Sequence, residues 1–368
     1  MDVLSWFPYS SLRVDHLLLP DGGYIRLFLD YIRIEWIGQS NSSGRLIFLD
    51  FKVCFVLSST SILVIAEGSM IQRERVADNV FFFQSDIYAQ VTAGAIIGPN
   101  WAVVIDTLAM PEETLAIRDY IEQELSVPVR YVVNTHYHAD HAWGTYFFPG
   151  ATVIGHSKCR KWLEEKGTRS LEATRKQSQT FRNVKIILPQ ITFDEGQLSL
   201  RVGKKNLAIF PLPGHSADNL AVFVEEDRIL FSGDACMPLP YIVDGDIDDL
   251  VASLKKVSKI GLENIVQGHG DIVLRGEIDG YIKENLYYLS QIRKAVRKAS
   301  RRKYPMDMLE EVSVESCGKS RVLIVGLAEE LHRRNLIALY RQMVGELPLA
   351  SDEEDEDFDE EVYDDDEG

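Results

Sequence analysis

Cysteine is scarce in this sequence, which contains four in 368 residues: Cys54, Cys159, Cys236 and Cys317. They are widely separated, and no two of them form a C-x-x-C pair. This pattern argues against a disulfide framework and fits a reducing compartment. The sequence therefore predicts a cytoplasmic protein.

Positive charge is also in short supply, with 39 Lys and Arg against 56 Asp and Glu and a net charge of −17. Residues 351–368 supply thirteen of the acidic residues and no basic one, so the remainder of the chain carries only −4. Binding a phosphate backbone requires positive charge. We therefore expect no nucleic-acid partner, and we expect the acidic segment to be a solvated, disordered extension that aids solubility.

A long uninterrupted apolar run is missing as well. The best candidate, residues 45–68, is interrupted by Asp50 and Lys52, and its cleanest part, 53–66, is short for a membrane span of about 20 residues. The segment also lies too far along the chain for a secretory signal. We expect no membrane association, with anchoring or export through residues 45–68 as the alternative.

The pattern of the chain changes near Met70. Residues 1–69 show neither a helical nor an alternating period, whereas β-rich and helical segments alternate from there to about 275. After that point apolar residues recur at helical spacing. The sequence thus predicts four parts: an N-terminal extension (1–69), an α+β domain (70–275), a C-terminal helical segment that packs on it (276–348) and an acidic disordered tail (349–368).

Within the α+β domain, the order of the elements can be predicted. Residues 79–107 are expected to form a meander of short strands, and the following "PEETLAIRDYIEQEL" has the proline and acidic residues of a helix start. Residues 129–135 form an apolar run typical of a buried strand, and 157–180 are polar and predict helix. Ligand-capable side chains follow directly after the buried strand, at the strand end where open α/β sheets place their sites.

Those side chains are His136, His138, Asp140 and His141, in the pattern H-x-H-x-D-H. At a strand end His136 and His138 alternate and can point to one side, while Asp140 and His141 can point toward a second position nearby. A lone histidine in a loop is usually a surface or core residue, but four such side chains at this spacing predict a metal site. Three more follow apolar runs of their own: His215, Asp234 and His269.

Imidazole and carboxylate ligands suit Zn²⁺ and also Fe or Mn. The first segment resembles the H-x-H-x-D-H signature of the metallo-β-lactamase superfamily, and the later segments "GHSADN", "SGD" and "GHG" resemble its remaining metal-binding motifs in the same order. The resemblance extends from about residue 75 to 275. It implies an αββα sandwich of two mixed β-sheets flanked by helices, here with a C-terminal helical extension, and a site for two divalent metal ions.

The resemblance also implies a role for each ligand. His136, His138 and His215 would bind the first metal, Asp140, His141 and His269 the second, and Asp234 would bridge them. The implied enzyme is a metal-dependent hydrolase, with zinc the expected metal, in which a metal-bridging hydroxide attacks an ester, thioester, lactone or amide carbonyl of a small molecule. Asp140 is the candidate catalytic residue, because it could orient the hydroxide and pass on a proton.

The ligand set distinguishes branches of this superfamily. The commonest zinc β-lactamases have cysteine at the position of Asp234 and lysine where this chain has Met237. The set here resembles that of hydroxyacylglutathione hydrolases and lactonases, so β-lactam hydrolysis is expected only as a minor activity. Two alternatives remain: an iron-dependent oxidoreductase on the same fold, and a non-catalytic scaffold, which the seven filled ligand positions disfavour. No oligomeric state and no particular substrate follow from the sequence.

Several other residues have weaker predictions. Asp106, Thr135 and Asn219 are expected hydrogen-bonding neighbours of the ligands, although Asn219 could equally shape a turn. His156 is expected to be structural and Cys236 a buried small side chain. The basic run 293–303 is most simply a solvated helix face, with contact to the acidic tail as the alternative. Aromatic residues beside the ligands could line a pocket or pack: Tyr137, Trp143 and Tyr241.

Overall fold

The computed structural model describes residues 71–242 and 244–345 in full, together with the backbone of five strands nearer the N-terminus. These strands are β1 (His16–Leu18), β2 (Tyr24–Phe28), β3 (Arg33–Ile37), β4 (Val53–Ser58) and β5 (Ser61–Ala66). The first three form an antiparallel sheet and the last two an antiparallel pair. The sequence showed no period here, so these strands were not predicted. The acidic tail lies outside the described residues.

The next part of the chain is built on a seven-stranded mixed sheet of order β12-β11-β10-β9-β8-β7-β6. Strands β7 to β9 form the predicted meander, β6 extends it on the N-terminal side, and all four pair antiparallel, while β9, β10 and β11 run parallel. The bounds are β6 (Ile71–Ala77), β7 (Val80–Ser85), β8 (Thr92–Ile97), β9 (Ala102–Ile105), β10 (Val129–Val133), β11 (Thr152–His156) and β12 (Ile191–Phe193).

Helices connect these strands. The predicted helix after the meander is α1 (Pro111–Asp119), with Glu112 and Glu113 in its first turn, and it continues as a π-helical turn, η2 (Tyr120–Glu124). Between β10 and β11 lie α2 (Ala139–Ala142) and η3 (Trp143–Phe147). The predicted helical stretch 157–180 is divided into α3 (Ser157–Trp162), a π-helical turn η4 (Leu163–Gly167), α4 (Thr168–Gln177) and η5 (Gln179–Phe181).

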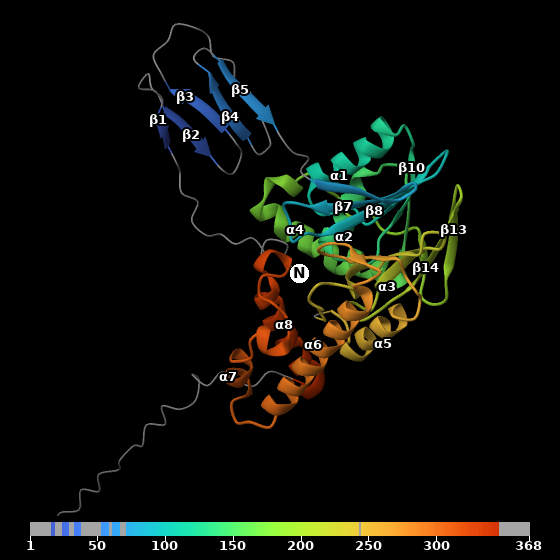
Figure 1. Cartoon of the computed structure of the whole chain (residues 1–368), viewed down its shortest axis with the longest axis vertical. Helices are drawn as coiled ribbons and strands as arrows, with labels where there is room; N and C mark the ends of the chain where they lie inside the picture. The colour runs from blue at the N-terminus through green and yellow to red at the C-terminus, as the bar shows by residue number, and fades with distance from the viewer. Residues whose placement is uncertain are drawn as a thin grey trace, which may run out of the picture. The chain divides into compact units, whose positions relative to one another are not determined.

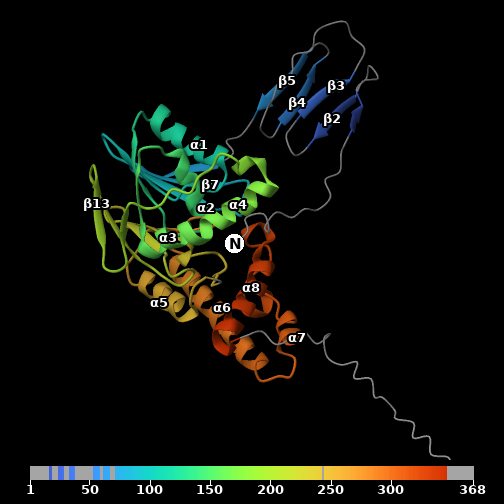
Figure 2. The same ribbon diagram turned by 180° about the vertical axis from the view of Figure 1, so that it is seen from behind.

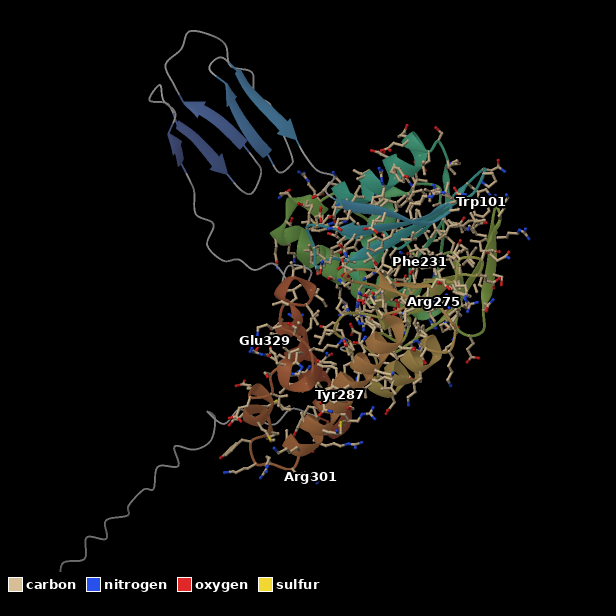
Figure 3. All side chains as sticks on the ribbon, in the orientation of Figure 1. Trp101, Phe231, Arg275, Tyr287, Arg301 and Glu329 are labelled. Carbon is tan, nitrogen blue, oxygen red and sulfur yellow. The ribbon has the colours of Figure 1, made fainter. Side chains whose placement is uncertain are left out.

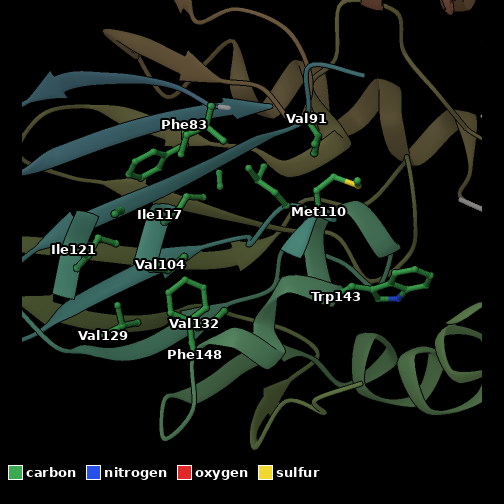
Figure 4. Packing of buried hydrophobic residues seen from close by; sticks show 14 of the residues in the cluster. Phe83, Val91, Val104, Met110, Ile117, Ile121, Val129, Val132, Trp143 and Phe148 are labelled. Carbon is green, nitrogen blue, oxygen red and sulfur yellow. The ribbon is translucent and has the colours of Figure 1, made fainter. Parts of the chain in front are cut away.

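The core of this part lies between α1 and the sheet. Ile117 and Ile121 are fully buried and pack with Val104 and Val132 of the strands, as Figure 4 shows. Burying one such aliphatic side chain contributes about 1.5–3 kcal/mol to folding. The cluster also holds Trp143, which is 1% exposed, so this aromatic residue packs in the core.

One carboxyl group is buried beside this core. Glu113 accepts a hydrogen bond of 2.8 Å from the Ser85 hydroxyl, which in turn accepts from the backbone N–H groups of Ile87 and Tyr88. Burial is the main reason that the pKa of Glu113 rises to about 7, although the Ser85 bond opposes it. The folded chain therefore holds a proton here that the unfolded chain has already released between about pH 4.5 and 7.

This carboxyl should make the chain less stable as the pH rises through that window, since the folded state binds more protons than the unfolded state. We expect Glu113→Gln to remove that pH dependence and to add up to about 3 kcal/mol to the free energy of unfolding at pH 8. Denaturant unfolding at about pH 5 and pH 8 measures the free energy of unfolding of each variant. Glu124→Gln, an exposed carboxyl on the same helical segment, is the control. Equal pH dependence in the wild type and Glu113→Gln would contradict the prediction.

The second part of the chain is built on a six-stranded mixed sheet in which β13 to β18 are neighbours in sequence order. Only β16 and β17 run parallel, because α5 (Ile247–Val257) connects them. Asp246 caps α5 by accepting from the backbone N–H groups of Asp248 and Asp249. The strands are β13 (Leu198–Val202), β14 (Lys205–Pro211), β15 (Leu220–Val224), β16 (Ile229–Phe231), β17 (Asn264–Val266) and β18 (Val273–Leu274).

The chain then becomes helical, as predicted. The long helix α6 (Ile278–Ala299) contacts α5, α7 (Pro305–Glu310) and α8 (Ala328–Val344), an arrangement visible in Figure 1 and from behind in Figure 2. Two 3-10 turns, η7 (Glu315–Cys317) and η8 (Ile324–Gly326), precede α8. In the part of the chain that the structure describes, no helix combines the length and the apolar character needed to cross a bilayer.

Candidate metal centre

The H-x-H-x-D-H segment leaves the carboxyl end of β10 and enters α2. His136, His138 and His141 are all buried, and the rings of His136 and His141 lie 4.3 Å apart. His136 Nε2 and His138 Nδ1 are 3.0 Å apart. Nitrogens at two tetrahedral positions around Zn²⁺, each about 2.0–2.1 Å from the ion, would be about 3.3 Å apart. The observed spacing therefore suits two ligands of one cation.

Asp106 holds this segment from the end of β9. Its Oδ1 accepts from the Thr135 backbone N–H at 2.8 Å, and its Oδ2 accepts from the Thr135 hydroxyl at 2.7 Å and from His141 Nδ1 at 2.9 Å. Since Nδ1 of His141 is the donor, the lone pair lies on Nε2, the nitrogen left to face a metal. Burial raises the pKa of Asp106, while His141 and Thr135 lower it. The predicted supporting roles of Asp106 and Thr135 fit these contacts.

His136 is oriented by the same group. Its Nδ1 lies 3.0 Å from the Thr135 hydroxyl oxygen, which donates its own hydrogen to Asp106 and so accepts from His136. The lone pair of His136 is thereby placed on Nε2, toward His138. Asp106 has a left-handed φ of 55°, a conformation that Asp tolerates better than most residues and that turns its carboxylate back toward the segment.

The second half of the centre comes from the loops after β14, β16 and β17. His215 Nδ1 donates to the Tyr241 carbonyl at 2.9 Å, so its lone pair is on Nε2, which lies 3.4 Å from Asp234 Oδ2. His269 Nε2 lies 3.4 Å from the same oxygen. A Cβ atom on Gly268 would lie 1.8 Å from Asp234 Oδ1, which explains the glycine before His269. One carboxylate oxygen is therefore within reach of two imidazoles.

The seven predicted ligands fall into two groups. Within each group, one ligand atom per residue lies within 4.8 Å of those of all the others. The groups are the predicted sets, with Asp234 in the first: His136, His138, His215 and Asp234, then Asp140, His141 and His269. Imidazole nitrogen and carboxylate oxygen are a donor set suited to borderline divalent ions such as Zn²⁺. The residues therefore fit the metal centre that the sequence predicts.

The C-terminal helices support the loop that holds His215. Asn335 of α8 donates to the Pro240 carbonyl at 2.7 Å and accepts from the Ile242 N–H at 2.9 Å, on either side of Tyr241. From α6, Tyr281 and Asn285 donate to the Met237 carbonyl. Sequence reasoning missed these contacts because the groups they hold are backbone carbonyls and an N–H, which every residue type carries.

One aromatic ring lies beside His138, and a second ring and a lysine pack against that first ring. The Tyr137 ring is 4.6 Å from the His138 ring and 5.2 Å from Trp162. The Lys166 ammonium lies 5.1 Å from the Tyr137 ring centroid and 4.6 Å from that of Trp162, within the range of cation–π contacts. Trp162 and Lys166 were missed, although their i,i+4 spacing could have shown that they share a helix face.

Asn219, together with His156 and Cys236, which were predicted to be structural or buried, has a structural role. Asn219 Nδ2 donates to the carbonyls of Leu212, Leu220 and Ser232, so it ties strand ends together. His156 accepts from the Lys158 N–H, belongs to neither ligand group, and has its pKa lowered by burial. Burial raises the pKa of the Cys236 thiol to about 12, so it is not a thiolate nucleophile near neutral pH.

Comparisons with known proteins agree with this geometry. The model of the metallo-beta-lactamase superfamily matches residues 88–269. The chain is 25% identical over 190 residues to a beta-lactamase-like protein 2 homolog of Caenorhabditis elegans, covering 51% of this chain and 58% of that one. It is 25% identical over 244 residues to the human acyl-coenzyme A thioesterase MBLAC2, covering 58% of this chain and 84% of that protein.

A solved structure shows the same fold. The stereoselective inverting sec-alkylsulfatase Pisa1 from Pseudomonas sp. superposes with a TM-score of 0.60 at 15% identity, over 75% of this chain and 51% of the sulfatase. At that identity the likeness concerns the fold alone. Two mixed sheets flanked by helices are the elements of the predicted αββα sandwich, and the fold class is confirmed. The C-terminal helical extension is present as well.

Proposed function

Because residues 88–269 belong to the metallo-beta-lactamase superfamily, we propose that the chain is a dinuclear metal-dependent hydrolase that cleaves the thioester of an acyl-coenzyme A or a related activated ester. The observation that carries the proposal is the position of Asp234 Oδ2, 3.4 Å from both His215 and His269, one from each ligand group. A carboxylate in that position can serve two metals. The thioester is favoured over the lactone and amide by the likeness to the human thioesterase.

Each of the seven side chains is assigned to one of two metal ions or to both. His136, His138 and His215 would hold one metal ion and Asp140, His141 and His269 the other, with Asp234 shared. When bound, divalent ions such as Zn²⁺ polarise the carbonyl oxygen and lower the pKa of water. Asp106 and Thr135 fix which nitrogen of His136 and His141 faces the site.

Asp140 is the proposed proton carrier. Its carboxylate is 15% exposed while the His141 ring is fully buried, and its Oδ2 lies 3.9 Å from His141 Nε2. A partly exposed carboxylate at this point can accept a proton from the attacking water at Oδ and return it to the leaving thiolate. Cys236 has no part in this chemistry, because its thiol stays protonated.

Metal analysis with a substrate panel tests the proposal. We expect about two metal ions per chain after reconstitution, and faster turnover of acyl-coenzyme A thioesters than of simple esters, lactones or β-lactams. Fewer than about two metals would remove the dinuclear assignment. Redox-active iron with oxygen consumption and no hydrolysis would identify an oxidoreductase on this fold instead.

Lys166 offers a finer test of the substrate class. Coenzyme A carries phosphates, and the Lys166 ammonium, which lies over the rings of Tyr137 and Trp162, could bind one of them. We expect Lys166→Met to raise KM for an acyl-coenzyme A about tenfold with little change in kcat, and to leave KM for an uncharged thioester unaltered. Lys161→Met, on the preceding turn and exposed, is the matched control. Equal effects on charged and uncharged thioesters would exclude phosphate recognition by Lys166.

A further inference from the structure

A strongly basic surface lies at the C-terminal end of α6. Five exposed cations recur at i, i+3, i+4, i+7 and i+8. Three lie on one face of the last turns of α6, and two lie in the turn that follows. They line a hollow of about 420 Å³, and Figure 3 shows Arg301 at the outer end of this segment. We call this surface the basic face: Lys294, Arg297, Lys298, Arg301 and Arg302.

Within the described part of the chain, no ion pair neutralises these five side chains. Their neighbour Arg293, by contrast, pairs with Asp248, and Lys319 lies 3.8 Å from Glu284. The helix dipole favours cations in the last turn of α6, but it does not remove their mutual repulsion. Like charges at i,i+4 each cost about 0.2–0.5 kcal/mol. A segment of opposite charge would relieve that repulsion.

The same chain contains such a segment. Residues 351–368 carry thirteen acidic residues and no basic one. The described chain runs to Gly345, directly after α8, and α8 packs against α6. The 23 residues from 346 onward could extend over about 75 Å, at about 3.3 Å per residue. The 22-residue α6 is only about 33 Å long, so every point of the basic face is within reach.

We propose that the acidic segment 351–368 docks on the basic face of its own chain. Tethering raises the effective concentration of the segment to about the millimolar range, so weak individual ion pairs suffice. Contacts of this kind are screened by salt, because the Debye length falls from about 30 Å at 0.01 M to about 3 Å at 1 M. The docked segment covers a basic surface that would otherwise attract polyanions. This proposal is independent of the reaction at the metal centre.

Zero-length carbodiimide cross-linking of the full chain tests the contact directly. We expect Lys294 and Lys298 to be joined to carboxyls of 351–368 about tenfold more often than Lys204, an exposed lysine in the β13–β14 turn, at about 0.01 M salt. The excess should vanish at about 1 M. Equal yields at all three lysines would overturn the proposal. Cross-links that disappear on dilution would assign the contact to a second copy of the chain and overturn docking within one chain.

A set of charge substitutions distinguishes docking of the acidic segment from a general effect of its negative charge. Replacing every Asp and Glu of 351–368 by its amide in the full chain should tighten binding to a short DNA oligonucleotide at least about tenfold. Adding Arg297→Glu and Arg301→Glu should abolish that gain. Lys255 and Lys259 are exposed on and just after α5, and changing these two residues to Glu instead should leave most of the gain in DNA affinity. A gain that survives the change at the basic face, or wild-type binding already as tight as the amide variant, would overturn the proposal.

Discussion

Replacing Asp234 by alanine is expected to lower kcat/KM by about three orders of magnitude or more, because metal-held charge in such sites is worth several kcal/mol in the transition state. The physical reason is the shared oxygen: Asp234 Oδ2 lies 3.4 Å from both His215 and His269. Without the Asp234 carboxylate, both ligand groups lose the negative charge that they share. Steady-state kinetics on the best thioester of the panel, with metal content per chain, measures the change.

The control for this substitution must show that the fold survives. Asp227→Ala removes another carboxylate, in the turn between β15 and β16, one that pairs with Lys205 and belongs to neither ligand group. We expect that variant to keep turnover and metal content, while Asp234→Ala keeps its circular dichroism and loses both. Turnover of Asp234→Ala within a few fold of the wild type would remove Asp234 from the site.

The positions of the candidate ligands could be predicted because they follow one rule of sheet architecture. His136 follows β10, His215 follows β14, Asp234 follows β16 and His269 follows β17, each after an apolar run that reads as a strand. Loops at the carboxyl ends of strands are where such folds gather functional side chains. The apolar runs were visible in the sequence, so the order and type of the main strands were too.

Asp106 and Thr135 could be predicted as supports, but the supports of His215 could not, because they depend on long-range contacts with backbone atoms. The carbonyl that orients His215 belongs to Tyr241, and its loop is fixed by Asn335 on the last helix. Nothing in residue type marks a carbonyl for such a role. The π-helical turn η4, which contains Lys166, was not revealed by side-chain periodicity between 157 and 180 either.

Changing Asp106 to asparagine should lower the affinity for metal about tenfold to a hundredfold, the effect expected when a ligand loses the group that orients it. The carboxylate accepts three hydrogen bonds, from the Thr135 N–H, the Thr135 hydroxyl and His141 Nδ1. An amide keeps one acceptor oxygen and places an N–H₂ against donors, so the His141 ring is no longer held with Nε2 toward the site.

Two further measurements distinguish positioning by Asp106 from direct catalysis. Titration against a chelator should show weaker metal binding by Asp106→Asn, and excess metal should restore most of kcat. Thr135→Val, which removes one of the three bonds and the relay to His136, should fall between the wild type and Asp106→Asn, while Thr135→Ser should behave as the wild type. If kcat stayed low with metal saturated, Asp106 would act on the reaction itself. If metal affinity were unchanged, its contacts would stabilise only the loop.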